Sequence, residues 1–194
     1  MRIKKFCDIR IGHAFRKRLA NVPDGDVMVI QPKNISSEGC VSFSPGEPLR
    51  IDAAVSKPLQ PGEVLVVNRG RFAATVFDLP DTNAWIAPSS ILVLSVKKES
   101  VLPEYVACYF NSTNGQELFR RHYEQTTVPF ISTKNLADMD IPIPPLKRQR
   151  ALIAFEKTVK EYARLTSRKQ ELHKQILSYK LVTKKQSIEF CEMT

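Results

Sequence analysis

The sequence predicts an α+β protein: a β-rich globule with a twisted sheet and short helices, followed by one long C-terminal helix of the coiled-coil type. Short apolar runs separated by Gly/Pro turns occupy residues 6–96, which is typical of strands. The apolar spacing then changes to a helical period. Finally, residues 146–183 contain no proline or glycine. At about 1.5 Å per residue, one helix over that stretch would be roughly 57 Å long.

Turn residues separate the predicted strands. Pro23-Asp24-Gly25 and Pro61-Gly62 are strong turn sequences, and each precedes a short apolar run. The run Val64–Val67 has no polar residue, as expected of a strand buried on both faces. The predicted strands are residues 6–11, 27–30, 64–67, 72–79 and 85–96, the last of them broken at Pro88-Ser89-Ser90.

Helices are predicted after residue 101. The first covers residues 102–111, with Pro103 in its first turn, and the second covers residues 114–125 with Asn114 as its N-cap. A short helical turn capped by Ser132 precedes a last strand over residues 139–143. Pro144-Pro145 should end that strand and begin the long helix, because proline fits only the first turn of a helix.

The long helix has an apolar stripe with heptad spacing. Its first four members are separated by three, four and three residues, and its last four by seven, four and three. The three-residue step between the two groups resembles a stammer. So narrow a stripe predicts a second helix as partner, although a long amphipathic helix folded onto its own domain is the alternative. The stripe consists of Leu152, Phe155, Val159, Tyr162, Leu165, Leu172, Ile176 and Tyr179.

The net charge also differs between the predicted globule and the predicted long helix. Residues 146–185 contain 12 Lys/Arg and 3 Glu, so this segment alone matches the net charge of +9 of the whole chain. A basic helix indicates an acidic partner, either nucleic acid or an acidic protein face, whereas a merely solvated face is the alternative. We therefore predict a globular domain of residues 1–145, a dimerisation helix of residues 146–183, and a poorly ordered tail of residues 184–194.

Several classes of protein are not predicted. The sequence contains no run of 18 apolar residues, so no membrane span is predicted. The scattered cysteines and the lack of a secretory pattern predict a cytoplasmic protein. No lysine has Asp or Glu two residues before it, as a common nuclease motif requires, and no glycine-rich cofactor loop or phosphate-binding loop occurs. No spacing of metal ligands occurs either, so we expect no enzyme activity, no cofactor and no metal.

Arg69 and Arg71 are the best candidates for a binding site. They flank Gly70 at the end of the predicted buried strand, and arginine both reads guanine and grips phosphate. Asn68 adjoins them. Other cations and amides follow predicted turns and suit phosphate or base-edge contacts, although each alone is equally consistent with a solvated loop. These further candidates are Arg16, Lys17, Arg18, Lys33, Asn34 and Lys134.

The order of several motifs resembles the specificity (S) subunit of type I restriction–modification systems. The similar elements, over about residues 3–180, begin with P-G-E-V-L from Pro61 and with Arg69-Gly70. They continue with P-E-Y-V from Pro103, the segment 132–136, and I-P-I-P-P-L from Ile141 with Gln149 downstream. The chain departs from the family at Arg148, where an acidic residue usually precedes the glutamine.

This resemblance implies one target recognition domain and one spacer helix, which is half of a complete S subunit. It implies a non-catalytic protein that binds double-stranded DNA and directs a DNA methyltransferase (modification) subunit, with or without a restriction subunit, to a bipartite site. Two copies joined through the long helix as a homodimer would supply both halves. The alternative is a non-catalytic adaptor or regulatory protein that uses the same scaffold to bind other proteins.

Overall fold

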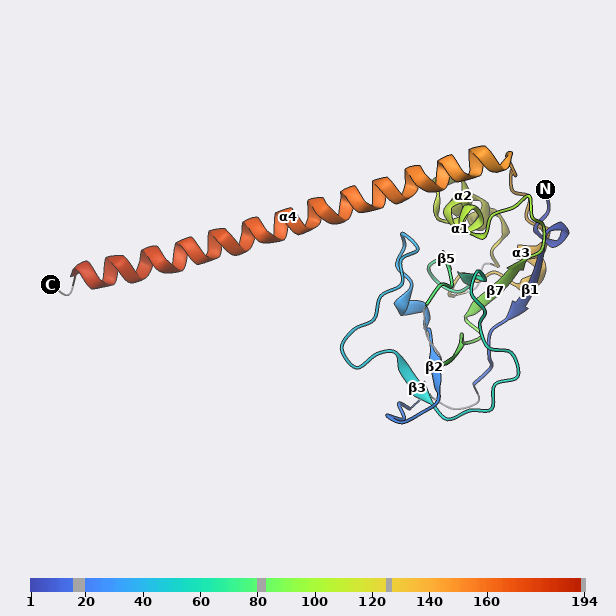
Figure 1. The fold of residues 1–194 in the computed structure, drawn as a ribbon, viewed down its shortest axis with the longest axis horizontal. Helices are drawn as coiled ribbons and strands as arrows, with labels where there is room; N and C mark the ends of the chain where they lie inside the picture. The colour runs from blue at the N-terminus through green and yellow to red at the C-terminus, as the bar shows by residue number, and fades with distance from the viewer. Residues whose placement is uncertain (16–19, 80–82, 125–126, 193–194) are drawn as a thin grey trace. The chain divides into compact units, whose positions relative to one another are not determined.

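The computed structural model describes residues 1–15, 20–79, 83–124 and 127–192, with the side chains of the long helix described as far as Tyr179 (Figure 1). The chain divides into two compact units, Met1–Ile153 and Ala154–Thr194. The first unit contains both sheets and the short helices. The second is formed by the long helix alone. The fold is therefore α+β, as the sequence predicts.

A four-stranded antiparallel sheet is the centre of the first unit. Its strand order is β1 (Cys7–Ile11), β7 (Ile91–Val96), β4 (Val64–Val67) and β5 (Ala73–Val76). The two inner strands, β7 and β4, pair in the register Val64↔Leu94. All four residues of β4 are buried, which confirms the prediction of a strand covered on both faces.

A second, three-stranded sheet has the order β3 (Leu49–Ile51), β2 (Val27–Val29), β6 (Ala84–Ile86). Strand β2 pairs antiparallel with β3 and parallel with β6. Two short 3₁₀ helices complete the N-terminal half: η1 (Ile3–Lys5) and η2 (Pro32–Asn34). Strand β3 was not predicted, because Arg50 interrupts its short apolar run.

Alternate residues of the inner strands face two different cores. One face of the four-stranded sheet packs under α1 and α2, and the other packs against residues of the second sheet (Figure 1). Since burying a large apolar side chain contributes about 1.5–3 kcal/mol, both faces stabilise the inner strands. Val64, Val66, Leu92 and Leu94 belong to the core with Phe110 and Phe119, whereas Leu65, Val67, Ile91 and Val93 belong to the core with Met28 and Trp85.

The helices that follow are α1 (Pro103–Asn111), α2 (Thr113–His122) and α3 (Thr133–Asp138). Helix α1 packs on β4 and β5, α2 packs on α1, and α3 packs on η1 and β1. The predicted Ser132 cap of α3 is confirmed, because its hydroxyl accepts the Asn135 N–H at 3.2 Å. The prediction that Asn114 caps α2 is wrong: Ser112 is the N-cap and accepts the Gly115 N–H at 3.2 Å.

The predicted strand over residues 139–143 is also wrong. This segment makes only one isolated bridge, Arg2↔Asp140, among the described residues. It still lies beside the N-terminus, since the Ile3 N–H donates to the Met139 carbonyl at 3.0 Å and the Ile141 N–H donates to the Met1 carbonyl at 3.2 Å. Pro142 and Pro144 have no N–H to extend the pairing, so the strand pattern stops there.

Helix α4 (Leu146–Glu192) begins directly after Pro145, as predicted. It continues past residue 183, where the sequence analysis placed the end of the helix. Its first two turns, to Ile153, belong to the globular unit. The proposed division into a domain, a dimerisation helix and a tail stays a prediction. Among the described residues, no helix is long and apolar enough to cross a membrane.

Gln149 attaches the start of α4 to the globular unit. Its side chain is fully buried (0 % exposed). The side-chain oxygen accepts the Leu102 N–H at 2.9 Å, and the side-chain nitrogen donates to the carbonyls of Ser100 and Pro144, both at 2.7 Å. All of the backbone groups that it satisfies flank the starts of α1 and α4. Gln149 therefore couples the two helices through hydrogen bonds that water cannot easily replace.

Replacing Gln149 with alanine should destabilise the globular unit. Leaving buried backbone groups unpaired costs about 1–3 kcal/mol each, so the free energy of unfolding should fall by at least about that amount. Urea unfolding followed by circular dichroism measures it. The control is Gln175→Ala, which removes an exposed glutamine from the same helix and should change stability by less than about 0.5 kcal/mol. Equal effects of the two substitutions would contradict the anchoring role.

Candidate nucleic-acid interface

The turn between β4 and β5, residues 68–72, presents two arginines on a rigid support. Gly70 has φ +75°, a conformation that favours glycine, and the turn leaves Arg69, Gly70 and Arg71 exposed. A neighbouring segment holds the turn from one side. The Gly70 N–H donates to the Pro129 carbonyl at 2.8 Å, and the Ile131 N–H donates to the Asn68 carbonyl at 2.8 Å. The backbone of the turn is thus fixed before any ligand binds.

The two guanidinium groups have different neighbours. The Arg69 guanidinium lies over the Phe130 ring, 5.5 Å from its centroid, which is a cation–π distance. The Arg71 guanidinium donates to the Ile35 carbonyl, just after η2. Among the described residues neither guanidinium forms an ion pair with a carboxylate, but the Arg71 charge, after the hydrogen bonds from Ser37 and Ser36, contributes to lowering the pKa of Glu38. Both arginines keep donors for a ligand while their positions are restrained, and Glu38 partly balances the charge of Arg71.

Arg71 also lines a hollow that the sequence analysis did not predict. The hollow has a volume of about 300 Å³ and lies between the β4–β5 turn, one side of α2 and Pro129. Arg120 contributes a second cation to it, while the Arg120 and Arg121 guanidiniums share the Glu117 carboxylate at 3.2 and 3.4 Å. In the sequence, the run Arg120-Arg121-His122 near the end of a predicted helix is the local feature that could have pointed to cations here. The residues that line the hollow are Gly70, Arg71, Phe72, Gln116, Arg120, Tyr123 and Pro129.

Near η2, the predicted contacts Lys33 and Asn34 are joined to Glu47. The Lys33 ammonium forms an ion pair with the Glu47 carboxylate, and the Asn34 amide donates to the same carboxylate at 2.8 Å. The Asn34 oxygen accepts the Gln31 N–H at 2.9 Å. Asn34 is buried (3 % exposed), so its side chain holds the turn, whereas Lys33 is exposed. The hydrogen bond from Lys33, followed by those from Ser44 and Asn34, lowers the pKa of Glu47.

The remaining predicted contacts are dispersed. Asn68 is buried, and its amide nitrogen donates a long hydrogen bond of 3.5 Å to the Ser89 carbonyl. Lys134 is exposed on α3, which packs on η1 and β1. Thus the structure brings Arg71 close to the η2 turn of Lys33 and Asn34 but places Lys134 elsewhere. Arg16, Lys17 and Arg18 lie outside the described residues.

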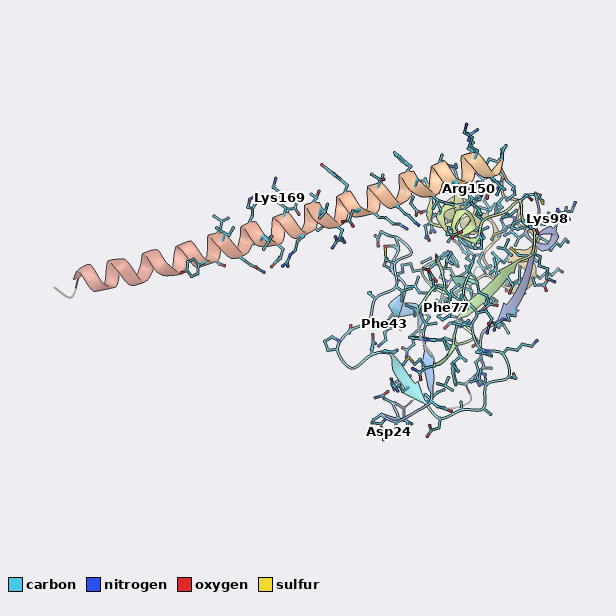
Figure 2. The ribbon with its side chains drawn as sticks, viewed as in Figure 1. Asp24, Phe43, Phe77, Lys98, Arg150 and Lys169 are labelled. Carbon is cyan, nitrogen blue, oxygen red and sulfur yellow. The ribbon has the colours of Figure 1, made fainter. Side chains whose placement is uncertain are left out.

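The residues predicted to bind a partner through α4 are solvent-exposed in the single chain. Their exposed fractions lie between 39 % for Leu152 and 74 % for Tyr162. Side chains such as Lys169 stand out from the same helix (Figure 2). The exposed members of the stripe are Leu152, Phe155, Val159, Tyr162, Leu165, Leu172, Ile176 and Tyr179.

Two further observations concern metal binding and thiol reactivity. They contain no group of three His, Cys, Asp or Glu side chains that could hold a metal ion. Burial, reinforced by the nearby Asp8 charge, raises the pKa of the Cys7 thiol to about 12. That thiol is therefore protonated at neutral pH and is a poor nucleophile.

The Lys33–Glu47 pair predicts a pH effect. Because the pKa of Glu47 in the folded state lies below its ordinary value of 4.5, its contribution to stability is present above that value and is lost as the pH falls through the lowered pKa. Lys33→Met removes the largest cause, so the pKa of Glu47 should rise toward the ordinary value. Carboxyl NMR titration of the two proteins measures this change. Lys5→Met is the control, and an unchanged Glu47 titration in Lys33→Met would refute the assignment.

Comparisons with known proteins agree with this architecture. The family model of the type I restriction modification DNA specificity domain matches residues 1–186. A solved chain from a study of complex assembly and conformational transition of the type I R-M system is similar at 23% identity and a TM-score of 0.63, over 87% of this chain and 40% of that one. No curated protein sequence matches the chain.

Two further solved structures have the same fold. The HsdS subunit from Thermoanaerobacter tengcongensis has 21% identity and a TM-score of 0.62, over 88% of this chain and 39% of that chain. The type I S subunit from M. genitalium has 16% identity and a TM-score of 0.56, over 83% and 38%. This chain thus spans about two-fifths of the length of these structures. Since the family model covers nearly the whole sequence, the chain belongs to the family of type I restriction modification DNA specificity domains.

Proposed function

We propose that this protein is a non-catalytic, sequence-specific DNA recognition subunit of a type I-like restriction–modification complex. It directs a methyltransferase subunit, and a restriction subunit where one is present, to a bipartite DNA site. Membership of the specificity-domain family supports the DNA target. The similarity in fold to a chain studied for type I R-M complex assembly supports the partners.

The observation that carries the proposal is the exposed arginine pair on the β4–β5 turn. Arg69 and Arg71 follow a strand buried on both faces, and the turn is hydrogen-bonded to residues 129–131. Such a support holds guanidinium groups in place with little loss of entropy on binding. Guanidinium groups donate two parallel hydrogen bonds to guanine and also bind phosphate, so this turn suits the reading of base edges.

Neighbouring cations extend the proposed interface. Arg120 lines the same hollow as Arg71, and the exposed Lys33 lies beside the turn that Arg71 contacts. Each has a carboxylate partner in the free protein, which a phosphate would have to replace. We assign Asn34 and Asn68, which are buried, to holding the two turns. Lys134 and the run Arg16, Lys17, Arg18 remain candidates for contacts farther along the duplex.

A bipartite site requires two recognition domains. In the proposed complex they come from two copies of this chain, joined through the exposed stripe of α4. A symmetric pair would read two inverted half-sites separated by a constant number of base pairs, since rigid helices would set their distance. The modification subunits would supply the methyl-transfer chemistry.

Selection from random DNA duplexes in the presence of the methyltransferase partner tests the function. We expect enrichment of two short conserved elements separated by a fixed, unread spacer. Enrichment of one continuous element would refute the two-copy arrangement. Recovery of no motif would instead favour an adaptor that binds proteins through the same scaffold.

The double substitution Arg69→Ala/Arg71→Ala should weaken specific binding at least about tenfold, since each good base contact is worth about 1–3 kcal/mol. Fluorescence anisotropy with the selected duplex measures it. Lys5→Ala/Lys98→Ala removes two exposed cations elsewhere on the same unit and should have a much smaller effect.

The matching arginine-to-lysine pair, Arg69→Lys/Arg71→Lys, separates charge from reading. Lysine keeps the charge but loses the planar fork, so nonspecific affinity should persist while selectivity falls. Circular dichroism confirms that each variant is folded, because Arg71 also contacts the Ile35 carbonyl. Unchanged affinity in the alanine pair would contradict the assignment of this turn to DNA.

A further inference from the structure

A hairpin after η2 carries a carboxylate close to Arg71. The chain reverses between Ile35 and Val41, which form an isolated antiparallel bridge. The Ile35 carbonyl, at the base of this hairpin, accepts a hydrogen bond from the Arg71 guanidinium. Glu38 is exposed at the tip, three residues farther along the chain. An acidic side chain thus stands within an interface whose other proposed contacts are cations and amides.

The hairpin is fixed against β5, so its tip has a defined position. Gly39 has φ +74°, and a Cβ atom there would collide with the Ala74 carbonyl oxygen and the Asn111 amide. The tip therefore packs directly on the strand that follows the β4–β5 turn. Within the hairpin, the Gly39 N–H donates to the Ser36 carbonyl at 3.0 Å, and the Cys40 N–H donates to the Ser36 hydroxyl at 3.1 Å.

The Glu38 carboxylate is both restrained and ionised. The Ser37 hydroxyl donates to it at 2.9 Å. Hydrogen bonds from Ser37 and Ser36, followed by the Arg71 charge, lower the pKa of Glu38 below its ordinary value of 4.5. At neutral pH the group is therefore a carboxylate, which accepts hydrogen bonds and donates none. Arg71 contributes the opposite chemistry, since a guanidinium donates and does not accept.

This combination of charges matches base edges better than phosphate. A phosphate that approached Arg71 would meet the charge of Glu38, and like charges repel. In the major groove, by contrast, a G·C pair presents the O6 and N7 acceptors of guanine beside the N4 amino donor of cytosine. Arginine suits the first and glutamate suits the second. Adenine also has a donor, N6, but its adjacent N7 acceptor suits an amide rather than a carboxylate.

Arg69 has a different environment from Arg71. Its guanidinium lies over the Phe130 ring, 5.5 Å from the centroid. An aromatic face restrains a cation but, unlike Glu38, has no net charge that would repel a phosphate. Arg69 is therefore suited to a phosphate contact, and the two arginines that flank Gly70 have separate roles.

We propose that Arg71 and Glu38 together read one G·C base pair in the major groove, where Arg71 donates to guanine O6 and N7 and Glu38 accepts from cytosine N4. Arg69 binds a phosphate of the same duplex. Glu38 also acts against wrong sites, because thymine in place of the cytosine would put the O4 acceptor against its charge. This inference rests on the proposed DNA recognition. It adds an acidic specificity residue, a base pair and a division of roles between the two arginines.

An analogue of cytosine tests the contact of Glu38. In the selected duplex, each cytosine in turn is replaced by 2-pyrimidinone, which lacks the N4 amino group and leaves the guanine in place. For the full-length chain with its methyltransferase partner, one such replacement should weaken binding at least about tenfold, as expected of a hydrogen bond to a charged group. In Glu38→Ala the same replacement should weaken binding less than about twofold. Glu99→Ala, at an exposed glutamate after β7, should respond as the wild type does.

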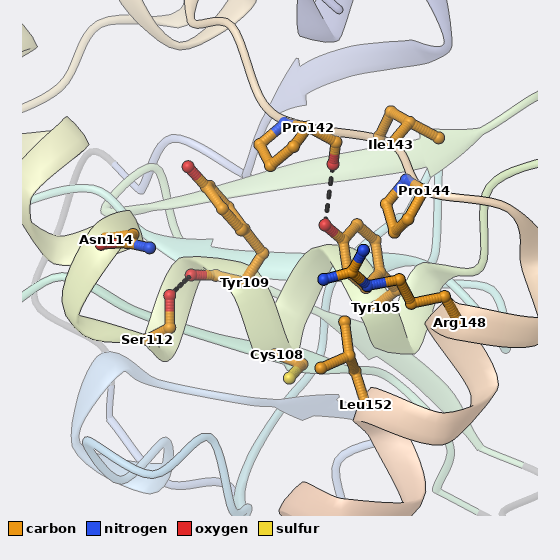
Figure 3. Close-up of a pocket in the computed structure, with 10 residues that line it drawn as sticks. All are labelled: Tyr105, Cys108, Tyr109, Ser112, Asn114, Pro142, Ile143, Pro144, Arg148 and Leu152. Atoms are coloured by element: carbon orange, nitrogen blue, oxygen red, sulfur yellow. Dashed lines mark hydrogen bonds between the residues drawn. The ribbon is translucent and has the colours of Figure 1, made fainter.

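Salt dependence tests the division of roles. The slope of log K against log salt concentration should fall in magnitude by about 1 in Arg69→Ala, which loses a phosphate contact. It should change much less in Arg71→Ala, which should instead lose the preference for the G·C pair. The control is Arg148→Ala, which removes an exposed guanidinium that lines a separate hollow with Tyr105 and Leu152 (Figure 3). This control should keep the G·C preference of the wild type.

The outcomes separate this inference from the function proposed above. A wild-type protein that selects no motif would refute DNA recognition itself and this inference with it. A selected motif without a G·C pair, or an equal effect of the cytosine analogue in the wild type and in Glu38→Ala, would overturn the reading by Glu38 and leave DNA recognition intact. An equal fall in salt slope for Arg69→Ala and Arg71→Ala would overturn the separate roles of the two arginines.

Discussion

Burial of β4 and β7 on both faces is the constraint on which the globular unit depends. Each strand sends alternate side chains into two separate cores, so helices must cover one face and the second sheet the other. A one-residue slip would exchange the two sets of side chains and disturb both cores. The end of β4 is consequently fixed, and with it the turn that exposes Arg69 and Arg71.

Where a segment's own residues decide its structure, the sequence was sufficient. Val64–Val67 is apolar throughout and forms a strand with the predicted bounds, and the long helix begins after Pro145 as proline chemistry requires. The errors arose where residues distant in the sequence determine the structure of a segment. Residues 139–143 have a strand pattern, but their neighbour is the N-terminus, which makes only one bridge there. Ser112 displaces Asn114 as a cap because α2 begins immediately after α1.

The candidate interface was predictable in chemistry rather than in geometry. Arg69 and Arg71 were identified because they flank a glycine at the end of a predicted buried strand and because arginine both reads guanine and grips phosphate. Nothing local reveals that Glu47 reaches back to Lys33 and Asn34, so the burial of Asn34 could not be foreseen. Arg120 was missed because the run Arg120-Arg121-His122 indicates cations near a helix end but not how α2 packs beside the turn.

The net positive charge of α4 connects the proposed pairing of two copies with the proposed binding of an acidic ligand. Among residues 146–185 the three glutamates are used within the helix: Glu156 pairs with Lys160, Glu161 pairs with Arg164, and Glu171 accepts from Gln175. Pairs of this kind, exposed or half-buried, contribute about 1 kcal/mol at most, and nine cations of the segment remain in excess after the three glutamates are counted. In the proposed pair, two such helices repel each other. An acidic ligand along the helices would reduce that repulsion, so pairing and the binding of DNA or of an acidic protein face would strengthen each other.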